Sequence, residues 1–176
     1  MVITETILKG AFVIELEPFT DVRGFFARAW SEREFEERGL NSRFVETNVS
    51  FNEKRGTLRG MHYQLAPYEQ AKLVRCTRGT IYDVIIDLRP DSPTFKQWFP
   101  LEMSADNHLM LYVPAKFAHG FQTLEDQTEV TYQTSAYYAP ELGRGVRWND
   151  PAFKISWPDD NLIMLDRDRG YHDFVA

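Results

Sequence analysis

The feature that most constrains the fold of this chain is a series of short β-branched and aromatic segments separated by turn signals. In residues 80–88 (TIYDVIIDL) the side chains alternate between two faces, as they do in a β-strand. Turn-forming stretches at residues 89–93 and 138–143 separate such segments. Many short strands without helices between them predict an all-β sandwich, jelly roll or barrel. Further strands are expected at residues 11–17, 109–114 and 129–134.

One window, residues 31–38 (SEREFEER), predicts a helix. Ser31 and Glu34 have the spacing of a capping box, and Gly39 supplies a stop signal. Because the window is short and highly charged, the helix is expected at the surface. No linker or internal repeat divides the chain, so residues 1–176 are expected to form a single domain.

Two aspartates complicate the strand expected at residues 80–88. Asp83 and Asp87 share one face of that strand with Ile81 and Ile85. Charges on an inward face need partners. We therefore expect this face either to be exposed to solvent or to line a wet cavity, such as the ligand pocket of a small jelly roll.

Charge and cysteine content exclude several classes of protein. The formal net charge is −6 and the sequence pI is about 5.3, which argues against a general nucleic-acid-binding protein. Cys76 is the one cysteine, so an internal disulfide and a thiolate zinc cluster are excluded. The sequence shows no secretory signal pattern and no apolar stretch long enough to span a bilayer, so we expect a cytoplasmic protein that does not bind membranes.

The histidines are the first candidates for chemistry. A metal site built on alternate strand positions would place a second histidine two residues after His62, where this chain has Gln64. Glu69 and His119 complete only a scattered ligand set. No metal and no other cofactor is therefore expected.

Proton transfer remains, because nucleophile-elbow and phosphate-loop motifs are missing from the sequence. His62 can act as a base near neutral pH. Lys72 and Arg59 can stabilise a developing oxyanion, and Tyr132 can act as an acid. Asp166 or Asp168 could orient a histidine. Residue types alone do not single out these residues from the other sets that could act as catalytic groups.

A series of ordered motifs narrows the choice. The chain resembles the dTDP-4-dehydrorhamnose 3,5-epimerase family, the cupin-type nucleotide-sugar epimerases, from about residue 5 to residue 170. The motifs that carry the resemblance are DVRGFF at 21–26, NVS at 48–50, LRGMHYQ at 58–64, QAKLV at 70–74, residues 83–89, PAKFAHGF at 114–121, YYAPE at 137–141, WNDP at 148–151 and DRD at 166–168.

The resemblance implies a cupin jelly-roll barrel with a few short peripheral helices, free of metal. It implies a homodimer that exchanges N-terminal strands, and a nucleoside-diphosphate 4-keto-6-deoxyhexose as substrate. The implied reaction inverts sugar carbons 3 and 5, in deoxysugar biosynthesis of the rhamnose type. A base removes the acidic hydrogen beside the ketone, an enolate forms, and an acid returns a proton to the opposite face.

The resemblance also assigns roles to individual residues. His62 matches the base, Asp168 its carboxylate partner and Tyr132 the opposing acid, while Lys72 matches the cation that supports the enolate oxygen. The residues that match contacts to the sugar, diphosphate and nucleotide are Arg23, Phe26, Asn48, Arg59, His119 and Tyr138. Asp83 is expected to hold either the His119 region or a neighbouring charge.

Strand alternation places Arg59 and His62 on opposite faces of one strand, although both match site residues. Gly60 lies between them and could mark a β-bulge that turns one of them.

Two positions depart from the pattern of the family, both on the side that binds the nucleotide. Arg28 stands where glutamate is usual, and Glu46 stands where glutamine is usual. Either the two residues form an ion pair, or they alter recognition of the base, because a guanidinium and a carboxylate present different donors and acceptors. The resemblance favours a thymidine nucleotide. The two departures leave cytidine or guanosine diphosphate sugars as alternatives.

The sequence leaves three other functional interpretations open. The chain could invert one carbon only, with the same base and acid. It could be a sugar-nucleotide binding module without activity, although such a module needs no acid–base pair. It could also be a metal-dependent cupin oxygenase or isomerase.

Overall fold

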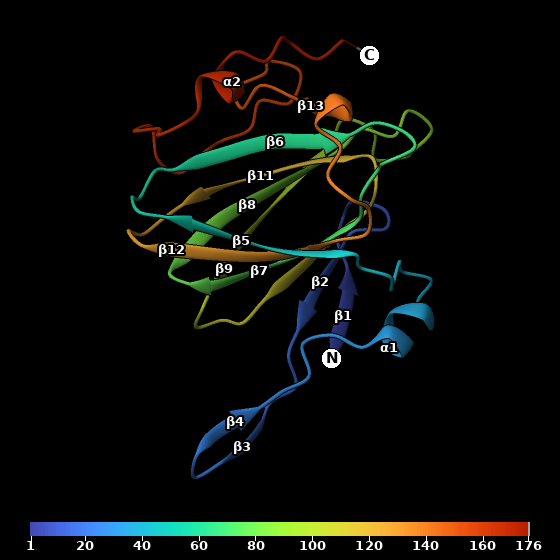
Figure 1. Cartoon of the computed structure of the whole chain (residues 1–176), viewed down its shortest axis with the longest axis vertical. Helices are drawn as coiled ribbons and strands as arrows, with labels where there is room; N and C mark the ends of the chain where they lie inside the picture. Colours follow the sequence, from blue (N-terminus) through green and yellow to red (C-terminus); the bar gives the residue numbers. More distant parts are fainter. Residues whose placement is uncertain (176) are drawn as a thin grey trace.

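Two antiparallel sheets lie face to face in the computed structural model, which describes residues 1–175 (Figure 1). This arrangement confirms the predicted all-β jelly-roll architecture. The first sheet has the strand order β1 (Val2–Glu5), β2 (Phe12–Glu15), β10 (Met110–Val113), β7 (Lys72–Arg78), β12 (Thr128–Thr134) and β5 (Glu46–Asn52). The second has the order β13 (Gly143–Gly145), β6 (Leu58–Gln64), β11 (Phe117–Thr123), β8 (Thr80–Asp87) and β9 (Trp98–Ser104).

Three peripheral helices and one hairpin complete the described residues. The helices are α1 (Glu32–Glu36), the 3-10 helix η1 (Pro140–Leu142) and α2 (Asp166–Arg169). The hairpin pairs β3 (Phe19–Asp21) with β4 (Gly24–Phe26). All four strands expected from the sequence are present, as β2, β8, β10 and β12.

The core lies between the two sheets because one face of each strand is apolar. Val74 and Cys76 of β7 face Ile85 of β8 and Phe121 of β11 in one buried cluster. The outer face of the second sheet is also covered, since Val84 and other β8 residues pack under the C-terminal segment. Burial on both faces explains why residues 80–88 carry apolar side chains on both faces of the strand.

Asp83 and Asp87 do point inward, and neither is exposed to solvent. Each has its own partners: Asp83 contacts His119, and Asp87 accepts hydrogen bonds from Arg89 and neighbouring hydroxyl groups. The expectation of a solvent-exposed face is therefore wrong. The physical reason is that both carboxylates pair with protein groups where water does not reach, although the Oδ1 atom of Asp83 has no hydrogen-bond partner among the described residues.

The predicted helix is present but shorter than expected, since α1 ends at Glu36. The Ser31 hydroxyl accepts a hydrogen bond from the Glu34 amide at 3.5 Å, as the capping box requires. The Glu34 side chain does not complete the box, because its carboxylate contacts the amino group of Met1 and the guanidinium of Arg28. Phe35 is fully buried, so the helix packs one side chain against the first sheet.

The expected bulge in β6 is confirmed. His119 of β11 pairs with His62, while Phe121 pairs with Arg59, so two residue steps on β11 match three on β6. The strands meet at Gly60 and Gly120, where a Cβ on Gly120 would lie 2.7 Å from the Arg59 carbonyl oxygen. The extra residue brings Arg59 and His62 to the same side of the sheet.

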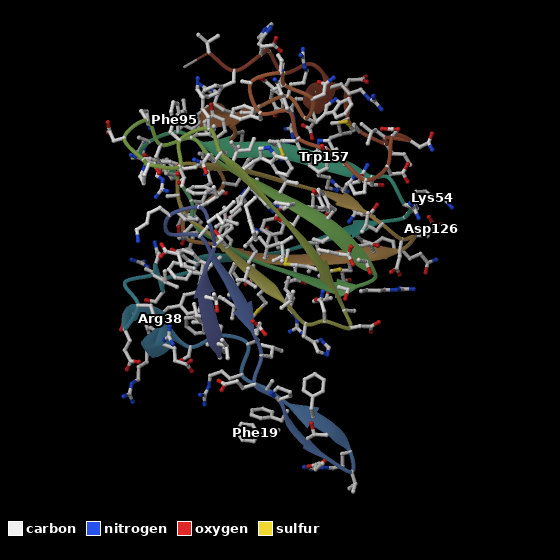
Figure 2. All side chains as sticks on the ribbon, turned by 180° about the vertical axis from the view of Figure 1, so that it is seen from behind. Phe19, Arg38, Lys54, Phe95, Asp126 and Trp157 are labelled. Carbon is white, nitrogen blue, oxygen red and sulfur yellow. The ribbon has the colours of Figure 1, made fainter. Side chains whose placement is uncertain are left out.

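The β3–β4 hairpin projects away from the two sheets (Figures 1 and 2). Every residue of its two strands is exposed, including three phenylalanines. Phe19 is 75% exposed and Phe26 is 72% exposed. An isolated two-stranded hairpin in water gains little stability by itself. Its exposed apolar side chains therefore indicate a surface that binds another molecule.

Asp87 gives a test of how the buried carboxylates contribute to stability. Burial acts to raise its pKa, but hydrogen bonds from Arg89, Ser92 and Thr94 outweigh burial and lower the pKa to about 2. Because the folded-state value is depressed, the stabilisation is present above the unfolded pKa and is lost as the pH falls towards 2. We expect Asp87→Asn to lower the free energy of unfolding by about 2 kcal/mol at pH 7.

Urea unfolding of the wild type and the variant measures this difference, which should shrink between pH ~4 and pH ~2. Asp91→Asn, in the same loop and exposed, is the control and should change little. An equal loss at every pH would contradict the ionic account of Asp87.

Candidate active site

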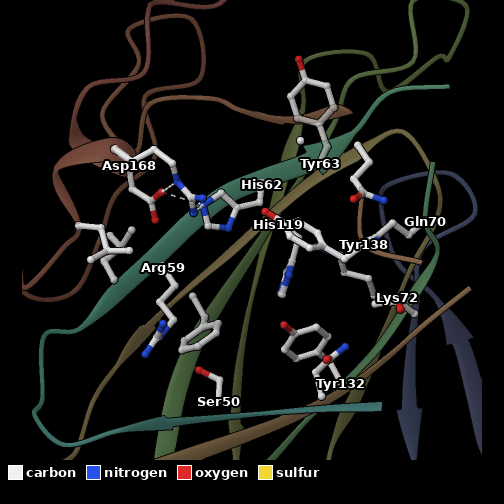
Figure 3. A pocket seen from close by; sticks show the side chains of 18 of the residues that line it. Ser50, Arg59, His62, Tyr63, Gln70, Lys72, His119, Tyr132, Tyr138 and Asp168 are labelled. Atoms are coloured by element: carbon white, nitrogen blue, oxygen red, sulfur yellow. Dashed lines mark hydrogen bonds and ion pairs between the residues drawn. The ribbon is translucent and has the colours of Figure 1, made fainter. Parts of the chain in front are cut away.

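A cavity of about 1100 Å³ opens between the two sheets, and Figure 3 shows side chains that line it. Its walls come from β5, β12 and β7 of the first sheet and from β6 and β11 of the second, with the C-terminal segment around α2 on one side. Nine of the predicted site residues lie here: Glu46, Asn48, Arg59, His62, Lys72, His119, Tyr132, Tyr138 and Asp168. The cavity therefore gathers residues from positions 46 to 168 of the chain.

His62 and Asp168 form a pair at the wall made by β6. The His62 Nε2 atom lies 2.9 Å from the Asp168 Oδ1 atom, and Asp168 is 2% exposed. The Gly60 amide donates to the other carboxylate oxygen at 3.3 Å, so the bulge also anchors this carboxylate. When Nε2–H donates to Asp168, the lone pair of His62 is on Nδ1, which leaves that nitrogen free to accept a proton.

Opposing effects set the protonation of this pair. Burial lowers the pKa of His62, and the contact with Asp168 raises it, with a net shift below the usual value. Burial acts to raise the pKa of Asp168, but hydrogen bonds from His62, Gly60 and Arg167 lower it overall. The pair therefore consists of a carboxylate and a neutral imidazole near pH 7.

A second histidine–aspartate pair lies beside the first, with its histidine on the neighbouring strand β11. The His119 Nε2 atom is 2.8 Å from the Asp83 Oδ2 atom, and both side chains are buried. His119 is the cross-strand neighbour of His62. Asp83 thus holds His119, which is one of the two roles expected for it from the sequence.

Lys72 brings a buried cation to the same cavity. Burial lowers the pKa of its ammonium group to about 8, although Asp83 acts in the opposite direction. A group with this pKa is still predominantly protonated at pH 7. A positive charge is therefore available where a negative charge develops in the cavity.

Tyr132 faces His62 from the opposite wall (Figure 3). It lies on β12 between Val74 of β7 and Asn48 of β5. Burial raises the pKa of Tyr132; Arg59 acts to lower it and Glu46 to raise it. The phenol is therefore protonated at neutral pH and can donate a proton.

Three predicted residues do not reach the cavity of their own chain. Arg23 and Phe26 lie on the projecting hairpin, where Arg23 contacts Asp21. Arg28 lies 3.5 Å from Glu34, so the expected ion pair with Glu46 is wrong within one chain. The reason is the direction of the hairpin, which carries residues 19–26 away from β5 (Figure 1).

Some lining residues were not predicted from the sequence. Arg167 contacts both Asp168 and His62 from α2, and Tyr171 packs its ring edge-on to His62 with centroids 6.1 Å apart. Gly145 leaves room for that ring, because a Cβ at this position would overlap it. The adjacency of Arg167 to Asp168 was the one available signal; the others depend on how the C-terminal segment folds back.

Residues 1–175 contain no group of three or more histidine, cysteine or acidic side chains placed to hold a metal ion. In the same part of the chain, no helix is long and apolar enough to cross a membrane.

The arrangement permits one kind of chemistry directly. A neutral imidazole on one wall can remove a proton from a bound molecule, and a phenol on the facing wall can deliver one. The ammonium group of Lys72 can stabilise the anion formed between these steps.

Comparison with known proteins agrees with this geometry. Residues 5–175 match the family model described as dTDP-4-dehydrorhamnose 3,5-epimerase. The Shigella flexneri protein of that name is 41% identical over 176 residues, which cover 99% of this chain and 97% of the relative. The Bacillus anthracis enzyme of that name, solved with TDP and PPi bound, is 44% identical with a TM-score of 0.94, covering 98% of this chain and 99% of that one.

A third similar protein, also of known structure, carries a different activity in its name. It is a 3'-monoepimerase from Streptomyces bikiniensis in complex with dTDP-quinovose. It is 32% identical with a TM-score of 0.89, over 97% of this chain and 86% of that one.

Proposed function

This chain belongs to the dTDP-4-dehydrorhamnose 3,5-epimerase family, and on that premise we propose that it inverts carbons 3 and 5 of a dTDP-4-keto-6-deoxyhexose. The observation that carries the proposal is the opposition of His62 and Tyr132 across one cavity. Inversion at carbon needs a proton to leave one face and return to the other, and these two side chains face each other from different sheets.

His62 acts as the base in this proposal. The hydrogens on carbons 3 and 5 flank the ketone at carbon 4 and are acidic for that reason. Neutral His62 accepts one of them on Nδ1, while Asp168 holds the ring and stabilises the imidazolium that forms. Lys72 supports the negative charge that moves onto the ketone oxygen as the enolate.

Tyr132 completes the inversion by donating its proton to the opposite face of the enolate. The raised pKa of this phenol keeps the proton in place until the enolate forms. The ketone returns when the carbon is protonated. The same steps serve the second carbon once His62 has released its extra proton to water and Tyr132 has regained a proton from water.

The remaining lining residues hold the substrate. Arg59 is anchored through its Nε atom to the Asn52 side chain at 2.7 Å, which directs a guanidinium group towards the cavity. Guanidinium and imidazole donors suit a diphosphate, so we assign Arg59 and His119 to the diphosphate and sugar. Asn48, Tyr138 and Glu46 then belong to the nucleotide side.

The hairpin residues fit this function when a second copy of the chain is present. None of Arg23, Phe26 and Arg28 lines the cavity of its own chain, yet Arg23 and Phe26 match nucleotide contacts in the family, and Arg28 stands at a position on the nucleotide side. A homodimer in which each β3–β4 hairpin covers the partner's cavity would bury the exposed phenylalanines and supply these contacts.

Residues 1–176 act as one domain in this proposal. Location in the cytoplasm stays a prediction.

One alternative has an observation in its favour. The similarity to a 3'-monoepimerase supports inversion at a single carbon by the same base and acid. A binding module without activity has no such support, because it would not need the His62–Asp168 pair opposite Tyr132.

The activity is tested by incubation of dTDP-4-keto-6-deoxyglucose with the protein in D₂O and proton NMR of the sugar. We expect deuterium at carbons 3 and 5 with the wild type. His62→Asn should reduce exchange at least ~10²-fold, because the general base is lost. His172→Asn removes an exposed histidine and should exchange normally.

The results of this exchange assay distinguish the candidate functions. Exchange at one carbon alone would identify a monoepimerase. Exchange in neither position, with folded protein, would overturn the proposed substrate and lead to the same assay with CDP and GDP sugars. Undiminished exchange in His62→Asn would contradict the assignment of the base.

The exchange of hairpins between subunits is tested by mixing inactive variants. If the hairpin completes the partner's cavity, a dimer of one His62→Asn chain and one Arg23→Ala chain has one intact site. Equal mixing with free subunit exchange should then restore ~25% of wild-type activity. A mixture of His62→Asn with Lys72→Ala is the control, because both residues belong to the same chain's cavity and no intact site can form. Equal activity in the two mixtures would contradict hairpin exchange.

A further inference from the structure

Arg167 is exposed at the surface, yet its guanidinium group lies next to His62, the proposed base. Its Nε atom is 3.2 Å from the Asp168 Oδ1 atom, the same oxygen that contacts His62. Its Nη2 atom is 3.5 Å from the His62 Nε2 atom. Both Arg167 and Asp168 belong to α2, so one short helix delivers a cation and an anion to one imidazole.

This arrangement answers a problem that the His62–Asp168 pair creates. A buried carboxylate 2.9 Å from an imidazole favours the doubly protonated ring. An imidazolium has no lone pair and cannot remove a proton from carbon. Burial opposes this protonation, and a positive charge placed beside the carboxylate opposes it further.

We propose that Arg167 is a positioning residue that offsets the negative charge of Asp168, so that His62 is held in place by the carboxylate but stays unprotonated until substrate binds. Its consequence for turnover rests on the proposed function, while the charge effect on His62 does not. Arginine suits this role because its guanidinium group is charged at every working pH and binds a carboxylate through several N–H groups.

The other groups around His62 do not supply the same effect. Lys72 of β7 also disfavours the imidazolium, but it is the cation assigned to the enolate. His119 of β11 is engaged by Asp83, and Tyr171 presents the edge of a neutral ring. Arg167 therefore remains as the cation that contacts the carboxylate itself.

The pKa directions agree with the geometry. Burial is the largest influence lowering the pKa of His62, Asp168 raises it, and Lys72 and Arg167 lower it. Removal of Arg167 should therefore shift this pKa upward, and removal of Asp168 should shift it downward.

The test is an NMR titration of the His62 ring in the full-length protein without substrate, with its signal assigned by its absence from His62→Asn. We expect Arg167→Gln to raise the pKa of His62 by ~0.5 unit or more, since a unit charge at this distance is only partly screened. Asp168→Asn should lower the pKa, and Arg167→Lys should restore most of the wild-type value. Arg169→Gln is the matched control, because this arginine lies on the same helix and contacts the Leu162 carbonyl instead.

Activity supplies the second measurement. Because His62 must be neutral to act as the base, the acid limb of the kcat/KM profile should move to higher pH in Arg167→Gln by the same amount as the NMR pKa. The rate on the high-pH plateau should stay within a few-fold of the wild type, because His62 is then neutral in both proteins.

An unchanged His62 pKa in Arg167→Gln, or an equal shift in Arg169→Gln, would overturn the proposal. A loss of kcat/KM at every pH without an NMR shift would also overturn it and make Arg167 a substrate contact. If the NMR pKa moves as expected while the acid limb does not follow, the charge effect stands and the assignment of His62 as the base fails.

Discussion

Ionisable side chains inside a β-sandwich are the constraint on which this structure depends. An unpaired charge between two sheets would cost several kcal/mol, so each one needs a partner at hydrogen-bonding distance. Three buried carboxylates meet this need in pairs: Asp168 with His62, Asp83 with His119, and Asp87 with Arg89. The first two pairs lie next to each other on β6 and β11, where the sheets separate to form the cavity. The interactions that make the interior stable are therefore also those that set the protonation of the site.

The bulge in β6 links the fold to the chemistry. The extra residue beside Gly60 turns Arg59 and His62 to one side, and the Gly60 amide binds the carboxylate that orients His62. Gly120 on the neighbouring strand allows the close approach. A regular strand in this place would direct one of the two functional side chains away from the cavity.

Much of the fold and of the site could be predicted from the sequence, for different reasons. Strand alternation identifies β8, and the capping residues Ser31 and Gly39 locate α1. The resemblance to the family, and not strand periodicity, identifies His62 and Tyr132 as cavity residues. Local sequence patterns do not show that two residues seventy positions apart face each other. Arg167 and Tyr171 could not be predicted, since their contacts depend on the path of the C-terminal segment over β6 and β13. The Arg28–Glu46 pair failed within one chain because sequence spacing does not give the direction of the β3–β4 hairpin.

If base and acid act from opposite walls of one cavity, Tyr132→Phe should separate their two steps. The variant keeps His62, Asp168 and Lys72 but loses the phenolic proton. In D₂O, with dTDP-4-keto-6-deoxyglucose, we expect exchange of the hydrogen removed by His62 to continue while formation of the inverted product falls by ~10²-fold or more. Equal loss of exchange and inversion, or inversion at the wild-type rate, would contradict an acid on the wall facing His62.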